Sequence, residues 1–395
     1  MFKRLAAVSA LCLIIASSPL TLQGYRIAFA SKSLLPEERS NISPFDSRTA
    51  MSLIEQVAEK SGSISFNATK TVILWYPSGT SACISKIIHK APNLTRTEYL
   101  PSSASTCGLR TVISDGKSTW HYEPDLQVVF HMTETSSLLD EGDAGTNHEE
   151  FNLTQDVSLI KANYDITLIG TENLAGRQAY IIGLEPRHPG NPSRKIWVDS
   201  EYPFVLRTEK YAPCGTMSSV SFYNWIEFFP TLSDDLFELD IPSHVAKVEL
   251  PVSGDLMPLD KLEKKAEFAI PVPGFVPPGY KIEGGMLSPY RAFPAAHIRL
   301  TDGLNTISYF VTPRIIDGNN RGENHVADVS DLLGTKFLRW SDQGYDFALV
   351  GEVDKSLLIE IAQSVNPPRM TRGLSQQSLS QYLTKFFYQM FWIDR

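Results

Sequence analysis

Residues 114–129 read SDGKSTWHYEPDLQVV, and this stretch decides what kind of fold the first half of the chain can adopt. The fragment SDGK is typical of a tight turn, because Gly116 can take a positive φ without steric cost. After the turn, Trp120 and Tyr122 alternate with polar residues, which is the period of a β-strand. A second turn begins at Pro124 and a second strand follows it. The stretch therefore predicts a hairpin with one aromatic side.

The same pattern of short strands and turns continues on both sides of this hairpin. Strands are expected at 64–76, 83–91, 94–100, 109–114, 118–123, 126–131, 164–170, 177–185, 194–199, 203–211 and 216–228. Many short strands joined by tight turns predict an antiparallel sheet rather than parallel βαβ units. Helices are expected at 49–60 and 151–162, so the class is α+β with mostly antiparallel strands.

A proline-rich stretch divides the chain. Residues 243–273 are predicted to be a linker, and a smaller α+β domain is expected over 274–366. In it, Asp354 is placed to cap a helix that runs from Lys355 to Val365. The remaining residues, 367–395, are expected to form a second linker and a C-terminal amphipathic helix.

Composition limits the class of protein. The chain has 395 residues with 43% hydrophobic and 20% charged residues, which is ordinary for a folded protein. Its net charge of −8 argues against nucleic acid as the main partner.

Lys3 and Arg4 precede an apolar run, and Ala28 to Ala30 fit a cleavage site, so residues 1–30 are predicted to be a signal peptide cleaved near Ala30. An uncleaved anchor is the alternative, but the run is shorter than the roughly 20 residues that span a membrane. The protein is thus expected to be periplasmic or otherwise exported.

Three cysteines remain after this leader: Cys83, Cys107 and Cys214. An odd number allows at most one disulfide among them. Cys83 and Cys107 are the expected pair, because they are close in sequence and an oxidising compartment permits the bond. Nothing in the sequence resembles the ligand spacing of a zinc site, and neither a metal nor another cofactor is expected.

No motif for catalysis stands out, so the protein is expected not to be an enzyme. Ser158 and Lys161 match S-x-x-K, but the other elements of a serine β-lactam enzyme are missing or in the wrong order. His121 lies on the side of its strand opposite Trp120 and is expected to be a solvent-side histidine. Sequons at Asn41, Asn67, Asn93 and Asn152 matter only in a host that glycosylates exported proteins.

Aromatic side chains on the expected strands are the remaining signal. They are Trp75, Tyr99, Trp120, Tyr122, Phe130, Trp197, Phe222 and Trp225. In one interpretation they form the core. In the other, a strongly curved sheet and the helices that plug it leave an apolar hollow, and these residues are its wall and its ligand-contact candidates.

The order of motifs resembles a known family. The turn and strand of 114–124 are followed by GR at 176–177, by KIWVD at 195–199 and PFVLR at 203–207, and by LF at 236–237. Over residues 49–242 the chain resembles the LolA-like half-barrel shared by periplasmic lipoprotein carriers and the N-terminal domain of MucB/RseB regulators. The segments GFVPPGY at 274–280 and FALVGE at 347–352 are similar to the small C-terminal domain of MucB/RseB proteins, which the simple carriers lack.

This resemblance implies a function. Proteins of the MucB/RseB family regulate an envelope-stress sigma factor by binding a membrane anti-sigma protein, and their half-barrel is thought to sense a lipid or lipoprotein. The expected partners are therefore a membrane anti-sigma protein and an acyl chain. A periplasmic lipid or lipoprotein carrier is the alternative. The acidic segment 134–150 and the aromatic tail depart from the family pattern.

The tail has its own pattern. Apolar residues recur every three to four positions over 378–391, namely Leu379, Tyr382, Leu383, Phe386, Phe387, Met390 and Phe391. Either this helix docks on its own chain, or it binds a partner groove or a membrane surface, with Tyr382, Phe386, Phe387 and Met390 as the contact residues.

Overall fold

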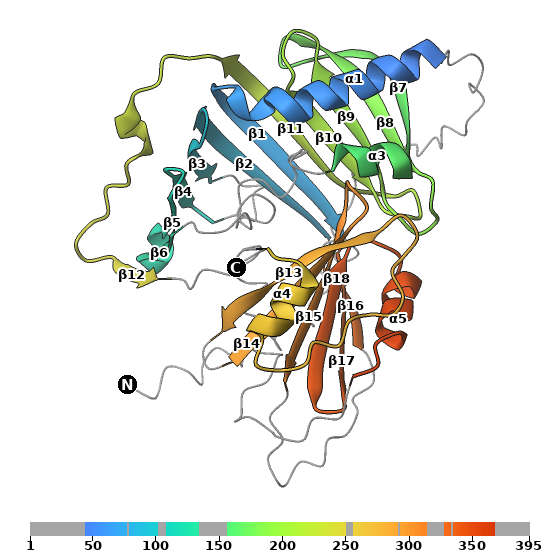
Figure 1. Ribbon diagram of the computed structural model, residues 1–395. Coiled ribbons are helices and arrows are strands. Elements are labelled where there is room, and N and C mark those ends of the chain that lie inside the picture. Colours follow the sequence, from blue (N-terminus) through green and yellow to red (C-terminus); the bar gives the residue numbers. More distant parts are fainter. Residues whose placement is uncertain are drawn as a thin grey trace, which may run out of the picture. The chain divides into compact units, whose positions relative to one another are not determined.

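The computed structural model describes residues 44–76, 79–101, 108–133, 156–249, 256–290, 293–313, 328–332 and 335–367. Within them the strands form two sheets, one of twelve strands and one of six (Figure 1). Almost all neighbouring strands are antiparallel. The predicted class, mostly antiparallel β with a smaller second sheet, is confirmed.

The large sheet consists of two antiparallel meanders joined in the middle. The first is β1 (Phe66–Tyr76), β2 (Gly79–Lys90), β3 (Leu94–Leu100), β4 (Arg110–Ser114), β5 (Ser118–Glu123) and β6 (Val128–Thr133). The second is β7 (Tyr164–Leu174), β8 (Arg177–Pro186), β9 (Ser193–Asp199), β10 (Val205–Tyr211) and β11 (Met217–Phe228). β1 pairs with β11, so the first and last strands of this set meet in the centre of the sheet.

The hairpin at 114–129 has its turns where the sequence places them. Gly116 has a φ of 78° between β4 and β5. The 3-10 turn η3 (Pro124–Leu126) separates β5 from β6 and ends at Gln127, which has a φ of 51°.

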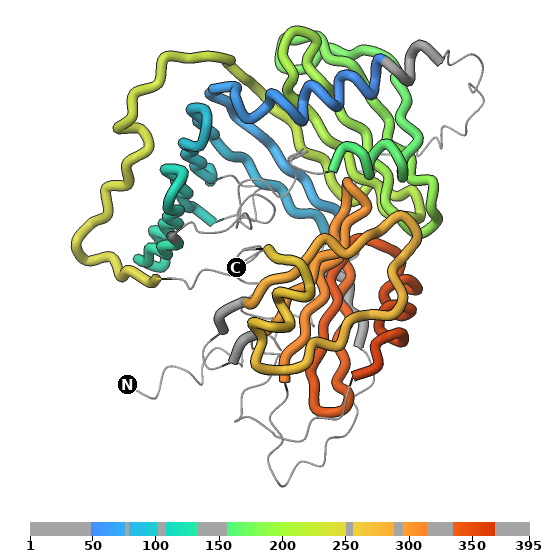
Figure 2. The backbone as a smooth tube through the Cα atoms, in the orientation of Figure 1, coloured from blue at the N-terminus to red at the C-terminus, as the bar shows by residue number. Residues whose placement is uncertain are grey.

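A return segment after β11 closes the far edge of the large sheet. It carries the 3-10 turn η4 (Asp234–Phe237), whose Phe237 packs against Ile88 and Ile113. It then forms β12 (Ala246–Glu249), which pairs with β6 in parallel. Figure 2 shows the path of this return segment along the backbone. The predicted linker at 243–273 therefore begins with a strand of the first sheet.

Two helices pack on the second meander. α1 (Pro44–Lys60) places Ile54 and Val57 in a buried cluster with side chains from β8 and β9. α3 (Val157–Asn163) joins the same cluster through Ile160. The side of the large sheet on which α1 and α3 pack is called the helix face below, and the opposite side is called the outer face.

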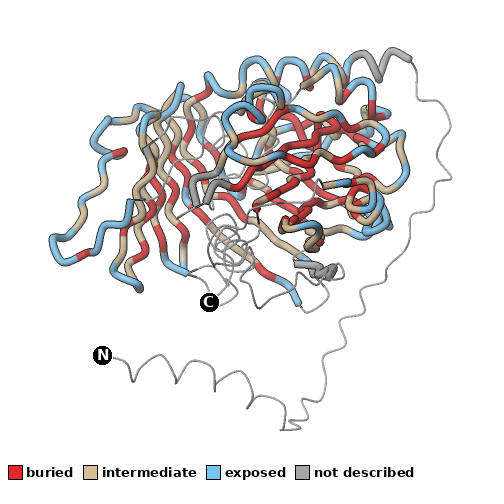
Figure 3. Tube along the Cα trace, turned by 60° about the horizontal axis from the view of Figure 1, so that its bottom comes forward, coloured by how far each residue is buried: buried red, intermediate tan, exposed pale blue. Residues whose placement is uncertain are grey.

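The small sheet follows. Its strands are β13 (Lys281–Tyr290), β14 (Phe293–Thr301), β15 (Thr306–Pro313), β16 (Asp328–Leu332), β17 (Thr335–Asp342) and β18 (Tyr345–Gly351), in the order β13-β14-β15-β18-β17-β16. α4 (Leu259–Lys265) and α5 (Lys355–Gln363) share one apolar cluster with it, so both cover the same face. The strands of both sheets carry most of the buried residues (Figure 3).

Asp354 stands at the N-cap position of α5, but its side chain makes no capping hydrogen bond. Its backbone N–H instead donates to the carbonyl of Gly190, 2.9 Å away in the loop between β8 and β9. The predicted helix is present, and the residue before it serves as a contact to the large sheet.

Candidate functional site

The eight aromatic residues proposed as the wall of a hollow lie on two different faces of the large sheet. Directly opposed residues on neighbouring strands point to the same face, so the strand register assigns each side chain. Tyr99 and Phe130 fall on the helix face. The other six fall on the outer face: Trp75, Trp120, Tyr122, Trp197, Phe222 and Trp225. The set does not line one surface, and ligand contact by any of the eight stays a prediction.

The hairpin strand β5 shows why the aromatic residues of this stretch lie on the outer face. Its polar residues Thr119, His121 and Glu123 are buried, while Trp120 and Tyr122 are only half-buried. His121 is 3% exposed, so its expected place on the solvent side is wrong. The alternation is as predicted, but the polar side of the strand faces the interior.

A row of polar side chains crosses the helix face of the first meander. Lys70, Ser85, Tyr99 and Arg110 are successive cross-strand partners from β1 to β4, and all four are buried. The guanidinium carbon of Arg110 lies 3.8 Å from the centre of the Tyr99 ring. The ammonium of Lys70 lies 5.6 Å from the centre of the Tyr223 ring. This face therefore holds buried positive charge beside aromatic rings.

One carboxylate belongs to the same region. Burial raises the pKa of Glu123 above its ordinary value, and the nearby charges of Arg110 and His121 oppose this rise. Because burial disfavours the charged carboxylate, Glu123 keeps its proton to a higher pH than an exposed glutamate does. The helix face thus combines apolar, cationic and titratable groups.

The outer face uses its aromatics mainly to hold strands together. Trp120 stacks on His131 of β6 with 5.1 Å between ring centres, and His131 Nδ1 lies 2.7 Å from Glu249 Oε2 of β12. Trp197 donates from Nε1 to Glu172 Oε2 at 2.6 Å and carries the Arg207 guanidinium over its ring. These contacts explain why the side chains are large and aromatic without a ligand.

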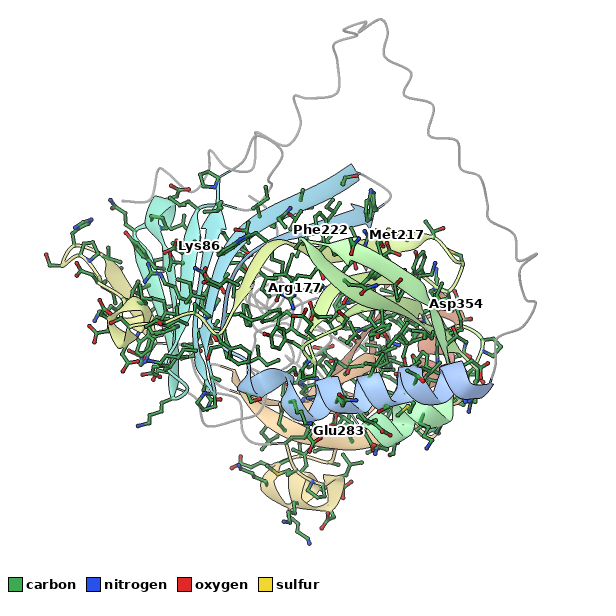
Figure 4. All side chains as sticks on the ribbon, turned by 90° about the horizontal axis from the view of Figure 1, so that it is seen from above. Lys86, Arg177, Met217, Phe222, Glu283 and Asp354 are labelled. Carbon is green, nitrogen blue, oxygen red and sulfur yellow. The ribbon has the colours of Figure 1, made fainter. Side chains whose placement is uncertain are left out.

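Part of the outer face is open to solvent. Trp75 is 37% exposed and Trp225 is 47% exposed. Phe222, on β11, and Lys86, on β2, also belong to this face, and Figure 4 shows both well away from α1.

A buried polar network joins the two sheets, and sequence analysis did not predict it. The Tyr164 hydroxyl donates to Asp302 Oδ2 at 2.6 Å and accepts from Asn305 Nδ2 at 2.7 Å. Asn163 Nδ2 donates to the carbonyls of Gly279 at 2.7 Å and Asp302 at 2.8 Å. The domain joint, as this network is called below, is formed by Asn163, Tyr164 and Arg194 of the large sheet's domain and by residues 302–305 of the small sheet's domain.

Apolar packing reinforces the domain joint. The side chain of Leu304 is buried in the cluster beneath α1, and its carbonyl accepts from Arg194 at 3.0 Å. Gly303 has a φ of 95°, and a Cβ at this position would lie 2.6 Å from the Cβ of Leu159. Burial, followed by the charge of Asp302, raises the pKa of Tyr164 well above its ordinary value. The hydroxyl therefore keeps its proton and acts as a donor.

The two described cysteines differ. Cys83 is disulfide-bonded. Cys214 is free and exposed in the β10–β11 turn, where hydrogen bonds with Thr216 lower the pKa of its thiol. Cys107, the predicted partner of Cys83, lies outside the described residues, so the pairing stays a prediction.

None of the described helices is both long and apolar enough to cross a membrane. Within the same residues, no group of three His, Cys, Asp or Glu side chains is placed to hold a metal ion. Residues 1–43 and the tail residues Tyr382, Phe386, Phe387 and Met390 lie outside the described part.

Comparison with known proteins identifies the family likeness. Residues 51–217 match the family model of the MucB/RseB N-terminal domain. This part of the chain is similar to the MucB/RseB N-terminal domain. The predicted resemblance is thereby confirmed for the first domain.

Solved structures extend the likeness in fold to both sheets. The crystal structure of MucB in complex with MucA(peri) is similar with a TM-score of 0.56 and 17% identity, covering 81% of this chain and 100% of that chain. The Pseudomonas aeruginosa MucA/MucB complex is similar with a TM-score of 0.55 and 17% identity, covering 82% and 100%. At this identity the likeness establishes the fold.

One curated protein is also related. An uncharacterised protein of Methanocaldococcus jannaschii is 26% identical over 218 residues, which are 51% of this chain. The chain spans 62% of that protein's length.

Proposed function

We propose that this protein is an exported, non-enzymatic regulator that binds a membrane anti-sigma protein of an envelope-stress pathway. The observation that carries the proposal is its likeness to MucB along both sheets, with MucA(peri) bound in the solved complex. A simple carrier would need only the first sheet. The buried domain joint supports the same proposal, since it holds the two domains together as one partner-binding body.

The proposal also includes a ligand at the helix face, of lipid or lipoprotein type. Two features support it. α1 and α3 cover an apolar cluster on the second meander, and such a cover could accommodate an acyl chain by shifting. On the first meander, Lys70 and Arg110 supply buried positive charge that suits a phosphate or carboxylate head group.

The S-x-x-K match does not support catalysis. The Ser158 hydroxyl donates to Asp156 at the start of α3, where the Asp156 carboxylate also accepts from the N–H groups of Ser158 and Leu159. This is helix capping, which ties the hydroxyl to a structural role. The proposed activity is binding alone.

The test is to cross-link the tagged mature protein in its own host and identify its partners by mass spectrometry. The expected partner is a single-span membrane protein with a cytoplasmic sigma-binding domain. Recovery of many lipoproteins, or of lipid without a fixed protein partner, would replace the regulator with the carrier.

The lipid half of the proposal needs a separate measurement. Lipids extracted from the purified protein are compared between Arg110→Gln and Lys86→Gln. Both changes remove one positive charge, but Arg110 lies on the helix face and Lys86 is exposed on the outer face (Figure 4). The expected result is loss of anionic lipid only in Arg110→Gln. Equal lipid content in both variants would rule out a head-group site at Arg110.

A further inference from the structure

The turn between β14 and β15 is buried, although the end of a hairpin is usually its most exposed part. Residues 302–305 form this turn and are called the tip below. All four are buried, and Leu304 is only 1% exposed. A Cβ on Gly303 would lie 2.6 Å from the Cβ of Leu159, so the tip lies against α3, beside the upper ends of the orange strands in Figure 1. The small sheet thus inserts a turn into the domain of the large sheet.

The tip presents one apolar side chain and two oxygen acceptors to that domain. The side chain of Leu304 belongs to the apolar cluster beneath α1, together with Ile54. The carbonyl oxygen of Leu304 and Asn305 Oδ1 each accept from Arg194 Nη2 at 3.0 Å. Arg194 is 7% exposed, and its Nε has no hydrogen-bond partner among the described residues. An apolar group in a cluster and two oxygens on a buried guanidinium are the contacts that a fatty acid makes.

We propose that the tip occupies a binding site for a single-chain anionic amphiphile, such as a fatty acid, and that this ligand binds by displacing the tip. The acyl chain takes the place of the Leu304 side chain beneath α1, and the anionic head group takes the two acceptor positions on Arg194. The inference rests on the lipid ligand of the proposed function, and it gives that ligand a regulatory effect. Arg194 lies on β9, so this head-group site differs from the one proposed at Arg110 on β4.

Charge favours an anion at Arg194 once the tip has left. The carboxylate of Asp302 leaves with the tip, because it accepts from the backbone N–H groups of Leu304 and Asn305. Displacement therefore removes a negative charge and leaves a buried guanidinium without its two acceptors, which costs free energy until an anion takes their place. The neighbouring cation on β10, Lys210, already has Glu352 as its partner at 3.2 Å. Arg194 is thus the group that selects an anionic head.

Displacement couples the ligand to the domain joint. The tip holds Tyr164 through Asp302 and Asn305, so a bound ligand and a closed joint exclude each other. By linkage, a change that weakens the tip tightens ligand binding by the same factor. The hydrogen bond from the Asp354 N–H to Gly190 lies outside the tip and keeps the two domains connected. The ligand therefore loosens the joint without separating the domains, which changes the surface that they offer together to a protein partner.

Binding of cis-parinaric acid to the full-length protein, followed by fluorescence, tests the displacement. Leu304→Ala removes the side chain that fills the site, and Leu300→Ala removes the same atoms from the core of the small sheet, where Leu300 is fully buried. The dissociation constant is expected to fall by about tenfold or more in Leu304→Ala and to stay unchanged in Leu300→Ala. Tyr164→Phe keeps the tip intact and should lower the constant by about threefold to 30-fold. Equal binding by all four proteins would overturn the proposal.

The head-group contact has its own readout, the ratio of the dissociation constants of the methyl ester and the free acid in Leu304→Ala. Opening of the tip affects both probes equally, so the ratio reports only the contact with the carboxylate. It is expected to be about tenfold or more, to approach one when Arg194→Gln is added, and to persist when Arg96→Gln is added. Arg96 is a matched control, because it is half-buried on the outer face and also donates to backbone carbonyls.

Two results separate this inference from the proposed function. Loss of the ratio in Arg110→Gln but not in Arg194→Gln would overturn the site at the tip and would keep a lipid ligand at the site proposed above. A lack of probe binding in every variant would overturn both the site at the tip and the lipid half of the proposed function.

Hydrogen exchange measures the tip itself. The backbone N–H groups of Leu304 and Asn305 are held by Asp302 Oδ1 in the closed joint. Saturating cis-parinaric acid should speed their exchange by about tenfold or more, while exchange in β18 stays unchanged. Unchanged exchange at the tip in protein that has bound the probe would show that the ligand binds without displacement, and it would refute the proposal.

Discussion

Replacing Tyr164 by Phe removes one hydroxyl from the centre of the domain joint and almost nothing else. That hydroxyl donates to the buried carboxylate of Asp302 at 2.6 Å and accepts from Asn305 at 2.7 Å. A hydrogen bond to a charged group contributes about 1.5–3 kcal/mol to stability. Asp302 keeps the backbone N–H groups of Leu304 and Asn305 on its other oxygen, which limits the loss. We expect the free energy of unfolding to fall by about 2 kcal/mol, which is roughly a 30-fold change in the unfolding equilibrium.

Urea unfolding followed by tryptophan fluorescence measures this change, and Tyr180→Phe is the matched control. Tyr180 is half-buried on β8, so loss of its hydroxyl is expected to cost less than about 0.5 kcal/mol. A double-mutant cycle with Asp302→Asn should give a coupling energy of about 1–2 kcal/mol, because the two side chains bond directly. Equal stability of Tyr164→Phe and Tyr180→Phe would refute the account of the domain joint given above.

Three further outcomes are expected. Gly303→Ala should destabilise the protein by several kcal/mol more than Gly215→Ala in thermal unfolding. Both glycines have a positive φ, but only Gly303 has neighbours within 3 Å of a new Cβ. Equal losses of stability in the two variants would contradict this reasoning. The lowered pKa of His297 means that the folded state binds the proton of this imidazole less readily than the unfolded state does. The free energy of unfolding should therefore be at its full value above pH 6.5 and decline by up to about 1.4 kcal/mol per pH unit as the pH falls toward 3. His297→Gln should flatten this slope in unfolding curves measured from pH 7 to 4. Peptide mapping without reduction should find Cys83 linked to Cys107. Cys107→Ser should lower the free energy of unfolding by about 3 kcal/mol, because a loop of about 25 residues is then released in the unfolded state. A different partner for Cys83 would disprove the pairing.

The features that sequence alone could predict are local ones. The turn at Gly116, the alternation of β5 and the helix ending at Lys60 depend on neighbouring residues, and the structure has all three. Helical spacing at Ile54 correctly indicated a buried stripe. Such patterns are set by backbone geometry within a few residues.

The features that escaped prediction depend on distant residues. Alternation showed that Trp120 and His121 point to opposite sides, but only the long-range register decides which side is buried. β12 is exposed at every position and so has no alternation to detect. Asp302 belongs to a recognisable turn, yet its partner Tyr164 is far away in sequence and has no motif of its own.

The pairing of β1 with β11 has a consequence for how the protein is made. Each meander can assemble from hairpins between consecutive strands, but the seam at Phe66 and Phe228 joins residues that leave the ribosome far apart in time. Such a non-local closure is slow, and until it occurs β1 keeps an open edge. During folding the first meander must therefore wait for the second, and the period between the two is when this protein is most exposed to proteases and to aggregation.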